Sequence, residues 1–146
     1  MKKAIFPGSF DPFTRGHEAI VRRGLQLFDR IVIAIGVNTE KQYMFSPEER
    51  LRLALDFFPD EPRIEALTYS DMTVDLCHRL GASFILRGIR NEKDLLYEQT
   101  IAAVNHTLDS SIETVILLAD IEHQDISSTL ERERLAHPQT DPHQQH

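Results

Sequence analysis

The chain has 146 residues, enough for one domain with a buried core, and its net charge of -7 at pH 7 argues against nonspecific nucleic-acid binding. Apolar residues make up 41% and charged residues 27%, as in ordinary globular proteins, and no apolar run approaches the roughly 20 residues of a membrane span. Cys77 is the single cysteine, which excludes an internal disulfide. One unpaired cysteine and no recognised signal peptide together predict a cytoplasmic protein.

The first half of the chain alternates between strand and helix patterns. Lys2–Phe6 predicts a short strand, and helical apolar spacing follows from His17 to Phe28. Arg30–Val37 is β-branched and nearly all apolar, which is typical of a strand covered on both faces. Ser46 then begins the segment SPEE, where an N-cap, a proline and a capping-box glutamate predict the start of a helix.

The second half continues this alternation as far as the tail. Its predicted elements are a strand Arg63–Tyr69, a helix Thr73–Leu80 ended by Gly81, a strand Ser83–Arg87, a helix capped by Asn91, a strand Glu113–Ala119 and a helix Ser127–Leu135. The tail HPQTDPHQQH has no apolar periodicity and is predicted to be disordered. We therefore expect one domain over residues 1–136 and a disordered tail over residues 137–146.

Five strands alternating with helices predict the α/β class. Parallel strands joined by helical crossovers favour a single-domain, Rossmann-like, doubly wound five-stranded parallel sheet with helices on both faces. Ligands of such sheets bind beyond the carboxyl ends of the strands. The sequence therefore directs attention to the residues that follow each predicted strand.

Cations and hydroxyls gather at those strand ends in an otherwise acidic chain. Two predicted helix N-termini join them, and helix N-termini bind phosphate groups. The residues concerned are Ser9, His17, Lys41, Ser70, Thr73, Arg87, Arg90, Ser127, Ser128 and Thr129. This grouping predicts a polyphosphate ligand, although neither the dinucleotide fingerprint nor the P-loop pattern occurs.

Two motifs carry a resemblance to a known superfamily. GSFDPFTRGH resembles the T/H-x-G-H region of the nucleotidyltransferases, and ISSTLER resembles their I-S-S-T-x-x-R signature, with Arg132 in its last position. The segment RGIRNEKDLLYE resembles the corresponding segment of the phosphopantetheine adenylyltransferase family. The likeness covers roughly Met1 to Leu130, and it implies the Rossmann-like fold predicted above.

The resemblance implies an enzyme of coenzyme A biosynthesis that transfers AMP from ATP to 4′-phosphopantetheine, giving dephospho-coenzyme A and pyrophosphate. The acceptor phosphate attacks directly, so catalysis is positioning and charge stabilisation. By match to the motif, His17 contacts ATP and stabilises the transition state, and Ser9 holds the attacking phosphate. Phe10 meets the nucleotide through its backbone, and Lys41 bridges the two phosphates.

The remaining site residues are also carried over by resemblance. Thr73 and Arg87 are assigned to the pantetheine substrate, and Arg87 reaches its phosphate. Ser9 is assigned to ATP as well as to the acceptor, and the further residues assigned to ATP are Gly88, Ile89, Arg90, Glu98, His123, Gln124, Asp125, Ile126, Ser127, Ser128 and Thr129. Magnesium is the implied cofactor and is carried mainly by the nucleotide phosphates, so no protein residue is assigned as a metal ligand.

Several of these residues have simpler interpretations. Arg87 and Arg90 could pair with Glu92 and Asp94 on the surface, and Glu98 could be a solvated helix residue. Ser127–Thr129 could be a plain N-cap. The alternative functions are a related transferase acting on nicotinamide mononucleotide or a small alcohol phosphate, and a nucleotide-binding module without catalysis.

The resemblance also implies partners and assembly. The expected small-molecule partners are ATP, 4′-phosphopantetheine and dephospho-coenzyme A, with coenzyme A as a candidate inhibitor; neither nucleic acid nor a membrane is expected. The family forms hexamers, and an apolar helix face made by Tyr97, Ile101, Val104 and Leu108 is available for association. The carboxyl end departs from the family, because Glu131 stands at a usually apolar position.

Overall fold

The fold is described by a computed structural model that covers residues 1–120 and 123–137, with the backbone alone for residues 123–127. Strands and helices alternate strictly along it. In chain order they are β1 (Lys3–Gly8), α1 (Arg15–Gly24), β2 (Arg30–Gly36), α2 (Pro47–Leu55), β3 (Ile64–Tyr69), α3 (Thr73–Leu80), β4 (Phe84–Ile89), α4 (Glu92–Leu108), β5 (Glu113–Leu118) and α5 (His123–Ala136). Among these helices, none combines the length and the apolar character needed to cross a membrane.

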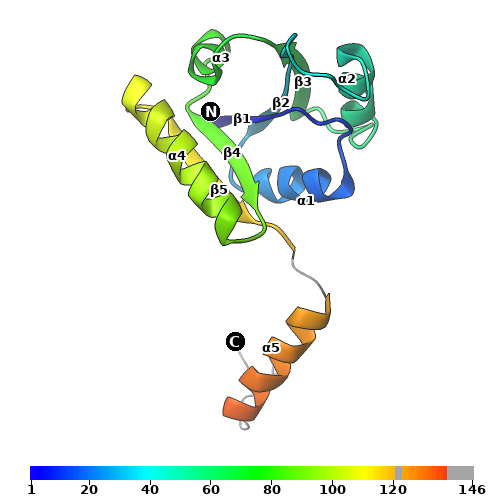
Figure 1. Cartoon of the computed structure of the whole chain (residues 1–146), viewed down its shortest axis with the longest axis vertical. Coiled ribbons are helices and arrows are strands. Elements are labelled where there is room, and N and C mark those ends of the chain that lie inside the picture. The colour runs from blue at the N-terminus through cyan, green and yellow to red at the C-terminus, as the bar shows by residue number, and fades with distance from the viewer. Residues whose placement is uncertain (121–122, 138–146) are drawn as a thin grey trace.

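The strands form one parallel sheet in the order β3-β2-β1-β4-β5 (Figure 1). The predicted fold class, a Rossmann-like five-stranded parallel sheet, is therefore confirmed. The strand order reverses between β1 and β4, because β2 and β3 lie on one side of β1 while β4 and β5 lie on the other. This reversal is the point at which open parallel sheets bind their ligands.

Two hydrophobic clusters cover the two faces of the sheet. Ile20 and Val21 of α1 and Ala54 of α2 pack on one face, with the buried side chains of β1 and β2. On the other face, Val74 and Cys77 of α3 pack against buried side chains of β1, β2 and β4. Cys77 is fully buried, and this burial raises the pKa of its thiol to about 11, so it belongs to the core.

The pairing of β1 differs on its two sides. Toward β2 it pairs along its whole length, as far as Gly8 opposite Ile35. Toward β4 the pairing covers only Ala4 and Ile5. Pro7 has no backbone N–H to donate, which agrees with the end of the ladder before this residue. The carboxyl ends of β1 and β4 therefore separate and leave a crevice between them.

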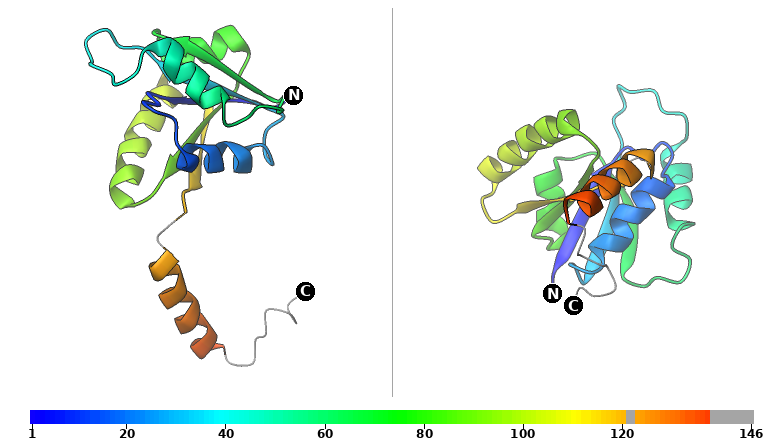
Figure 2. Two further views of the ribbon diagram at one scale, coloured as in Figure 1. Left: turned by 90° about the vertical axis from the view of Figure 1, so that its right-hand side faces the viewer. Right: turned by 90° about the horizontal axis from the view of Figure 1, so that it is seen from below.

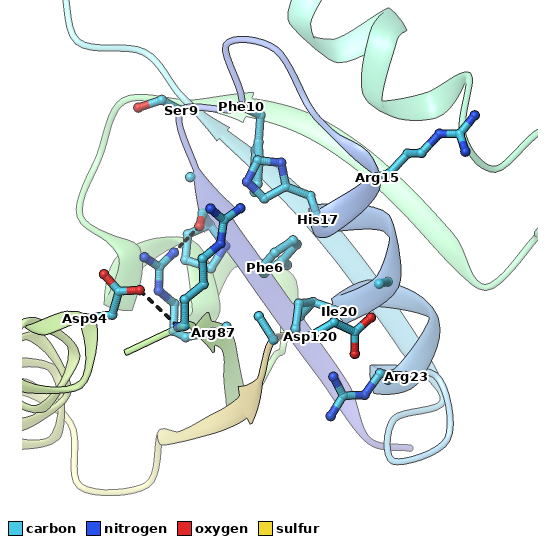
Figure 3. A pocket seen from close by; sticks show the side chains of 17 residues that line it. Phe6, Ser9, Phe10, Arg15, His17, Ile20, Arg23, Arg87, Asp94 and Asp120 are labelled. Carbon is cyan, nitrogen blue, oxygen red and sulfur yellow. Dashed lines mark hydrogen bonds between the residues drawn. The ribbon is translucent and has the colours of Figure 1, made fainter. Parts of the chain in front are cut away.

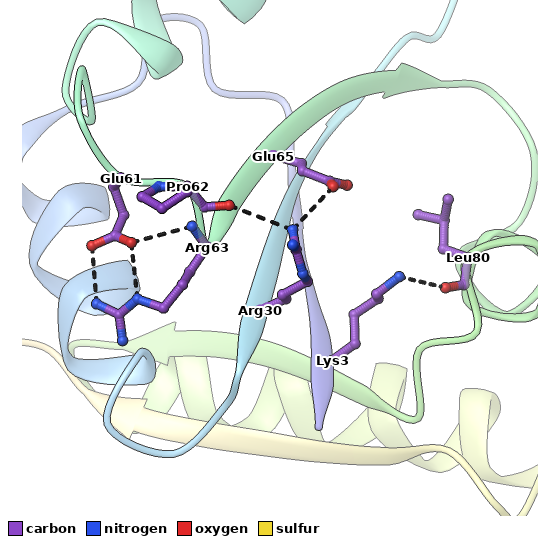
Figure 4. Close-up of polar contacts among 7 residues, drawn as sticks. All are labelled: Lys3, Arg30, Glu61, Pro62, Arg63, Glu65 and Leu80. Carbon is purple, nitrogen blue, oxygen red and sulfur yellow. Dashed lines mark hydrogen bonds and ion pairs between the residues drawn. The ribbon is translucent and has the colours of Figure 1, made fainter. Parts of the chain in front are cut away.

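The amino edge of the sheet, at the opposite ends of the strands, is held by polar contacts (Figure 4). Arg63 binds both carboxylate oxygens of Glu61 at 2.8 and 2.9 Å. Arg30 contacts Glu65 at 3.3 Å, and Lys3 donates to the carbonyl of Leu80 at 2.9 Å. These cations each have a carboxylate or carbonyl partner, and they tie strand starts to neighbouring segments.

Helix α4 exposes the face that the sequence marks as apolar. The exposed fractions are 64% for Tyr97, 40% for Ile101, 52% for Val104 and 50% for Leu108. Glu98, by contrast, is buried on the same helix, with 5% exposed. The acidic Glu98 side chain therefore faces the protein interior, and the apolar stripe faces outward.

Helix α5 stands apart from the sheet in Figure 1 and in the left-hand view of Figure 2. It begins at His123, four positions before the predicted start at Ser127. Residues 128–137 are all exposed. The predicted tail begins at residue 137, and residues 138–146 lie outside the described part of the chain.

Candidate functional site

A cavity of about 720 Å³ occupies the crevice between the carboxyl ends of β1 and β4 and the start of α1 (Figure 3). This volume is in the range of small-molecule sites. Four arginines line it, Arg15, Arg23, Arg87 and Arg90, against two aspartates, Asp94 and Asp120. A cavity with excess positive charge in a chain of net charge -7 is suited to an anionic ligand.

The loop from β1 to α1 forms one wall of this cavity. Phe10 has a positive φ of 48°, and its buried ring packs against Gly8. A Cβ atom on Gly8 would lie only 2.8 Å from the Cζ atom of that ring. Glycine is therefore required at position 8 chiefly to admit the Phe10 ring, and Ser9 is left exposed between them at the rim.

Asp11 fastens this loop to the loop that follows β2. Its carboxylate accepts the backbone N–H of Met44 at 2.6 Å and that of Phe45 at 2.8 Å. This arrangement agrees with a loop-shaping role for Asp11. It also connects the two loops that carry Ser9 and Lys41.

His17 lies in the first turn of α1 and points toward the cavity (Figure 3). Its ring packs edge-on against Phe10, with ring centroids 4.9 Å apart, and against Phe13 at 5.2 Å. Thr14 caps the helix, and its backbone N–H donates to Nδ1 of His17 at 3.0 Å. The ring is therefore fixed from both sides.

The hydrogen bond from Thr14 also sets the protonation of His17. A backbone N–H only donates, so Nδ1 must carry the lone pair and a neutral ring carries its proton on Nε2. Burial lowers the pKa of His17 below its ordinary value of 6.5, and the nearby Arg90 and Arg87 lower it further. His17 is thus held as a neutral hydrogen-bond donor at pH 7.

A second, smaller cavity of about 170 Å³ adjoins the first. Thr73, Tyr97 and Asn105 line it, and so do Arg87 and Glu98. Both cavities share Pro7, Gly8 and Arg87. Two ligands occupying the two cavities would therefore meet at the end of β1.

Arg87 is held firmly at this junction. Its Nε and Nη2 atoms donate to the two carboxylate oxygens of Glu98 at 2.9 and 2.7 Å, and Nη1 donates to the carbonyl of Pro7. Glu98 is buried and the Arg87 side chain is 26% exposed, so this fork is a partly buried ion pair that fixes the guanidinium in one place. Asp94 contacts the backbone N–H of Arg90 at 3.0 Å, and the described residues show no hydrogen bond to the Arg90 guanidinium.

Comparison with known proteins places the chain in a family. The model of the cytidylyltransferase-like family matches residues 5–134. The phosphopantetheine adenylyltransferase of Flavobacterium johnsoniae is 55% identical over 94% of this chain and 90% of its own length. That of Bacteroides fragilis is 45% identical over 94% of this chain and 91% of its own length. The chain belongs to the phosphopantetheine adenylyltransferase family.

More distant structures share the fold of this family. A lipopolysaccharide core biosynthesis protein from Thermoplasma volcanium matches with a TM-score of 0.59 at 18% identity, over 84% of this chain and 98% of its own. A bifunctional NMN adenylyltransferase/ADP ribose pyrophosphatase from Francisella tularensis matches with a TM-score of 0.63 at 15% identity, over 84% of this chain and 39% of its own. At these identities the likeness concerns the fold alone.

The structure brings together eight of the seventeen residues that resemblance to phosphopantetheine adenylyltransferases assigns to the site. The larger cavity is lined by Ser9, Phe10, His17, Gly88 and Arg90. The smaller cavity is lined by Thr73, Arg87 and Glu98. The residues assigned to the two substrates do not separate fully, because Glu98, assigned to ATP, lines the smaller cavity, and Ser9, assigned to the attacking phosphate, lines the larger one. Arg87 belongs to both cavities.

Other assigned residues lie elsewhere in this structure. Lys41 is exposed on the loop after β2 and lines neither cavity, and the side chain of Ile89 is buried in the core. Ser128 and Thr129 are exposed on α5, away from the sheet. The side chains of His123, Gln124, Asp125, Ile126 and Ser127 lie outside the described residues. The roles of all these residues stay predictions.

Some cavity residues were not predicted from the sequence. Arg23 lies seven positions after Gly16, on the same side of α1, and donates to the carbonyl of Leu118 at the end of β5. Helical spacing from the motif could have found it. Asn105 lies seven positions after Glu98 on α4 in the same way, and both line the smaller cavity.

Proposed function

We propose that this chain transfers AMP from ATP to 4′-phosphopantetheine, giving dephospho-coenzyme A and pyrophosphate. The observation that carries the proposal is the pair of cavities that meet at Pro7, Gly8 and Arg87. The larger one, rich in arginine, suits a triphosphate, and the smaller one suits a slender chain such as the pantetheine arm. Membership of the phosphopantetheine adenylyltransferase family supports this assignment.

In the reaction, an oxygen of the acceptor phosphate forms a bond to the α-phosphorus of ATP, and the bond from that phosphorus to the β-phosphate bridge oxygen breaks. Pyrophosphate leaves with the electron pair. No protein nucleophile takes part. His17 donates from Nε2 to the phosphoryl oxygens as charge builds on them, and the start of α1 adds its positive end.

The other residues bind and orient the two substrates. We assign Arg90, Gly88 and Ile89 to ATP, with Ile89 acting through its backbone, and the segment His123–Thr129 to ATP as well. Ser9 and Lys41 are assigned to the acceptor phosphate, and Thr73 to the pantetheine side. Glu98, assigned to ATP, acts on it through Arg87, since its carboxylate is bound by that guanidinium.

We propose Mg²⁺ as the cofactor, entering with the ATP phosphates. The described residues contain no group of three His, Cys, Asp or Glu side chains arranged to hold a metal. Asp94 and Asp120 line the larger cavity, and their carboxylates would accept hydrogen bonds from water molecules bound to the ion. This donor set fits Mg²⁺, which is commonly bound by substrate phosphates with one or two carboxylates and waters. When bound, the ion neutralises phosphate charge.

We also propose a homohexamer in the cytoplasm, with dephospho-coenzyme A as product and coenzyme A as an inhibitor. The exposed stripe of Tyr97, Ile101, Val104 and Leu108 on α4 supports association, because a single chain leaves this apolar surface in water. Light scattering at micromolar concentration tests the assembly. A monomer there would contradict it.

The function is tested by pyrophosphate release with ATP and Mg²⁺. The purified chain is offered 4′-phosphopantetheine, nicotinamide mononucleotide, a small alcohol phosphate with CTP, or no acceptor. We expect release with 4′-phosphopantetheine only, together with dephospho-coenzyme A. Turnover with another acceptor would identify a related transferase, and binding of ATP without turnover would identify a module without catalysis.

A further inference from the structure

Arg50 of α2 is a fully buried cation that the reaction does not use directly. Its Nη1 atom donates to the carbonyl of Ser9 at 2.7 Å and to the carbonyl of Gly36 at 2.9 Å. Its guanidinium carbon lies 3.9 Å from the centre of the Tyr43 ring. One side chain therefore holds the end of β1, the end of β2 and the loop after β2.

The charge of Arg50 is balanced in an unusual way. Within the described residues no carboxylate contacts it, and its buried Nε and Nη2 atoms have no hydrogen-bond partner. Carbonyl dipoles and one aromatic face are its only partners there. Burying a charge without a counter-ion is costly, and an apolar residue of similar volume would pack there at lower cost. Stability alone therefore does not account for an arginine at this position.

The contacts around Arg50 lead to two loops. Ser9 lies on the first loop, and Arg50 binds its carbonyl. Tyr43 stacks on Arg50, and its hydroxyl accepts the N–H of Asn38 at 3.0 Å. The carbonyl of Asn38 in turn accepts the N–H of Lys41 at 3.0 Å. A chain of contacts thus runs from Ser9 through Arg50 and Tyr43 to the backbone of Lys41.

We propose that Arg50 is a positioning residue that sets the placement of Ser9 relative to Lys41. This inference rests on the proposed function, in which both residues meet the acceptor phosphate. Arginine suits the task because its planar group can donate to two carbonyls in its plane while stacking on Tyr43 with its face. Lysine would keep the charge but could not do both.

The first test compares kinetic constants in variants that keep the fold. Arg50→Lys is expected to lower kcat about 10- to 100-fold, since small misplacements of reacting groups cost up to about this much. The KM for ATP is expected to change far less. Tyr43→Leu, at a half-buried position, is expected to lower kcat in the same selective way. Tyr43→Phe keeps the stacking ring but loses the hydroxyl that binds Asn38, so it is expected to recover only part of that loss. Arg63→Lys, at the amino edge of the sheet, is the matched control.

The second test is a double-mutant cycle with Lys41→Ala. If Arg50 acts through the Lys41 loop, Arg50→Lys adds little further loss of kcat in the Lys41→Ala background. Backbone amides of residues 38–45 should also exchange faster in Arg50→Lys and Tyr43→Leu. Additive losses, or unchanged kcat with unchanged exchange, would overturn the inference. An inactive wild-type chain would instead refute the proposed function, while the exchange measurement would still test the contacts.

Discussion

The two edges of the sheet use cations in opposite ways. At the amino edge, Arg63 is paired bidentately with Glu61, and Arg30 lies against Glu65 (Figure 4). At the carboxyl edge, Arg50 binds carbonyls without a counter-ion, and the described residues show no hydrogen bond to the Arg90 guanidinium. Paired cations hold segments together, whereas cations without a counter-ion leave a positive field for a ligand. The same residue type therefore has different roles according to its partners.

Arg87 stands between these two cases. It is paired with Glu98, as at the amino edge, but it lies at the junction of both cavities. The Arg87 side chain is 26% exposed and its partner is buried, whereas Arg63 is 51% exposed and Arg30 is 38% exposed. The two hydrogen bonds to Glu98 hold the Arg87 guanidinium in one orientation, and its other edge can still face a ligand.

The largest expected effect comes from the neutral imidazole at the carboxyl edge. His17→Ala is expected to lower kcat by about 10²–10³-fold, as for the loss of one transition-state donor, with a much smaller change in KM. Steady-state kinetics with both substrates measures this. Because the pKa of His17 is lowered from 6.5, its donor form should persist as pH falls to that value. Any loss of wild-type kcat/KM caused by protonation of His17 should therefore have its midpoint below pH 6.5.

The control for this variant is the exposed histidine at the other edge. His78 lies in the last turn of α3 and contacts Asp109. It lines neither cavity. His78→Ala should keep the wild-type kcat. A near-normal kcat in His17→Ala, or equal losses in both variants, would remove His17 from the proposed role.

The next effect concerns Arg90, for which the structure shows no guanidinium partner in the described residues. Arg90→Ala is expected to weaken ATP binding about 10- to 100-fold, as for the loss of a hydrogen bond between charged groups. Calorimetry with ATP measures this, with Arg63→Ala as the paired-arginine control. If both variants lost ATP affinity equally, the distinction between the two edges would fail.

A smaller and more selective effect is expected at the junction. Arg87→Ala should weaken 4′-phosphopantetheine binding more than ATP binding, because Arg87 lines the smaller cavity beside Thr73, and its N–H groups that do not bind Glu98 can meet the acceptor phosphate. Removing Arg87 also leaves Glu98 buried without its partner, so Arg87→Lys is needed as a variant that keeps the charge. Calorimetry with each ligand separates the effects. Equal losses for both ligands would show that Arg87 does not select the acceptor.

The sequence predicted the sheet well because strand patterns depend on local residues. All five strands were found within a few positions of their predicted bounds, and the family assignment was confirmed. The longer extent of β1, to Gly8, was missed because Pro7 and Gly8 disfavour strands. Their place in β1 depends on pairing with β2, which no local pattern contains.

Tertiary context decided the features that the sequence did not predict. Helical spacing could have placed Arg50 on the buried face of α2, because it lies four positions before Ala54, yet a charge normally marks a solvated position. On α4 the apolar stripe is exposed, and its use for association stays a prediction. Local pattern could not say that Glu98 would be the buried residue. Its burial depends on Arg87, a residue eleven positions away on another element.

The smallest expected effects lie at the amino edge, where charges are paired and exposed. Glu61 has its pKa lowered to about 2, mainly by its hydrogen bond to Arg63, and Asp109 has its pKa lowered to about 2, mainly by His78. A carboxyl group whose pKa is lowered in the folded state stabilises the fold at pH values above its ordinary pKa, which is near 4. This contribution is lost as the pH falls toward 2. Glu61→Gln and Asp109→Asn should therefore lower the melting temperature by at most a few degrees near neutral pH.

The difference from wild type should shrink as the pH falls from about 4 to about 2, because the wild-type carboxylates are then protonated as well. Thermal unfolding over this pH range, with kcat measured at neutral pH, tests both parts. Both variants should keep the wild-type kcat and KM, since neither residue lines a cavity. A loss of activity without loss of stability would show that the amino edge communicates with the site, and the contrast between the two edges would then not hold.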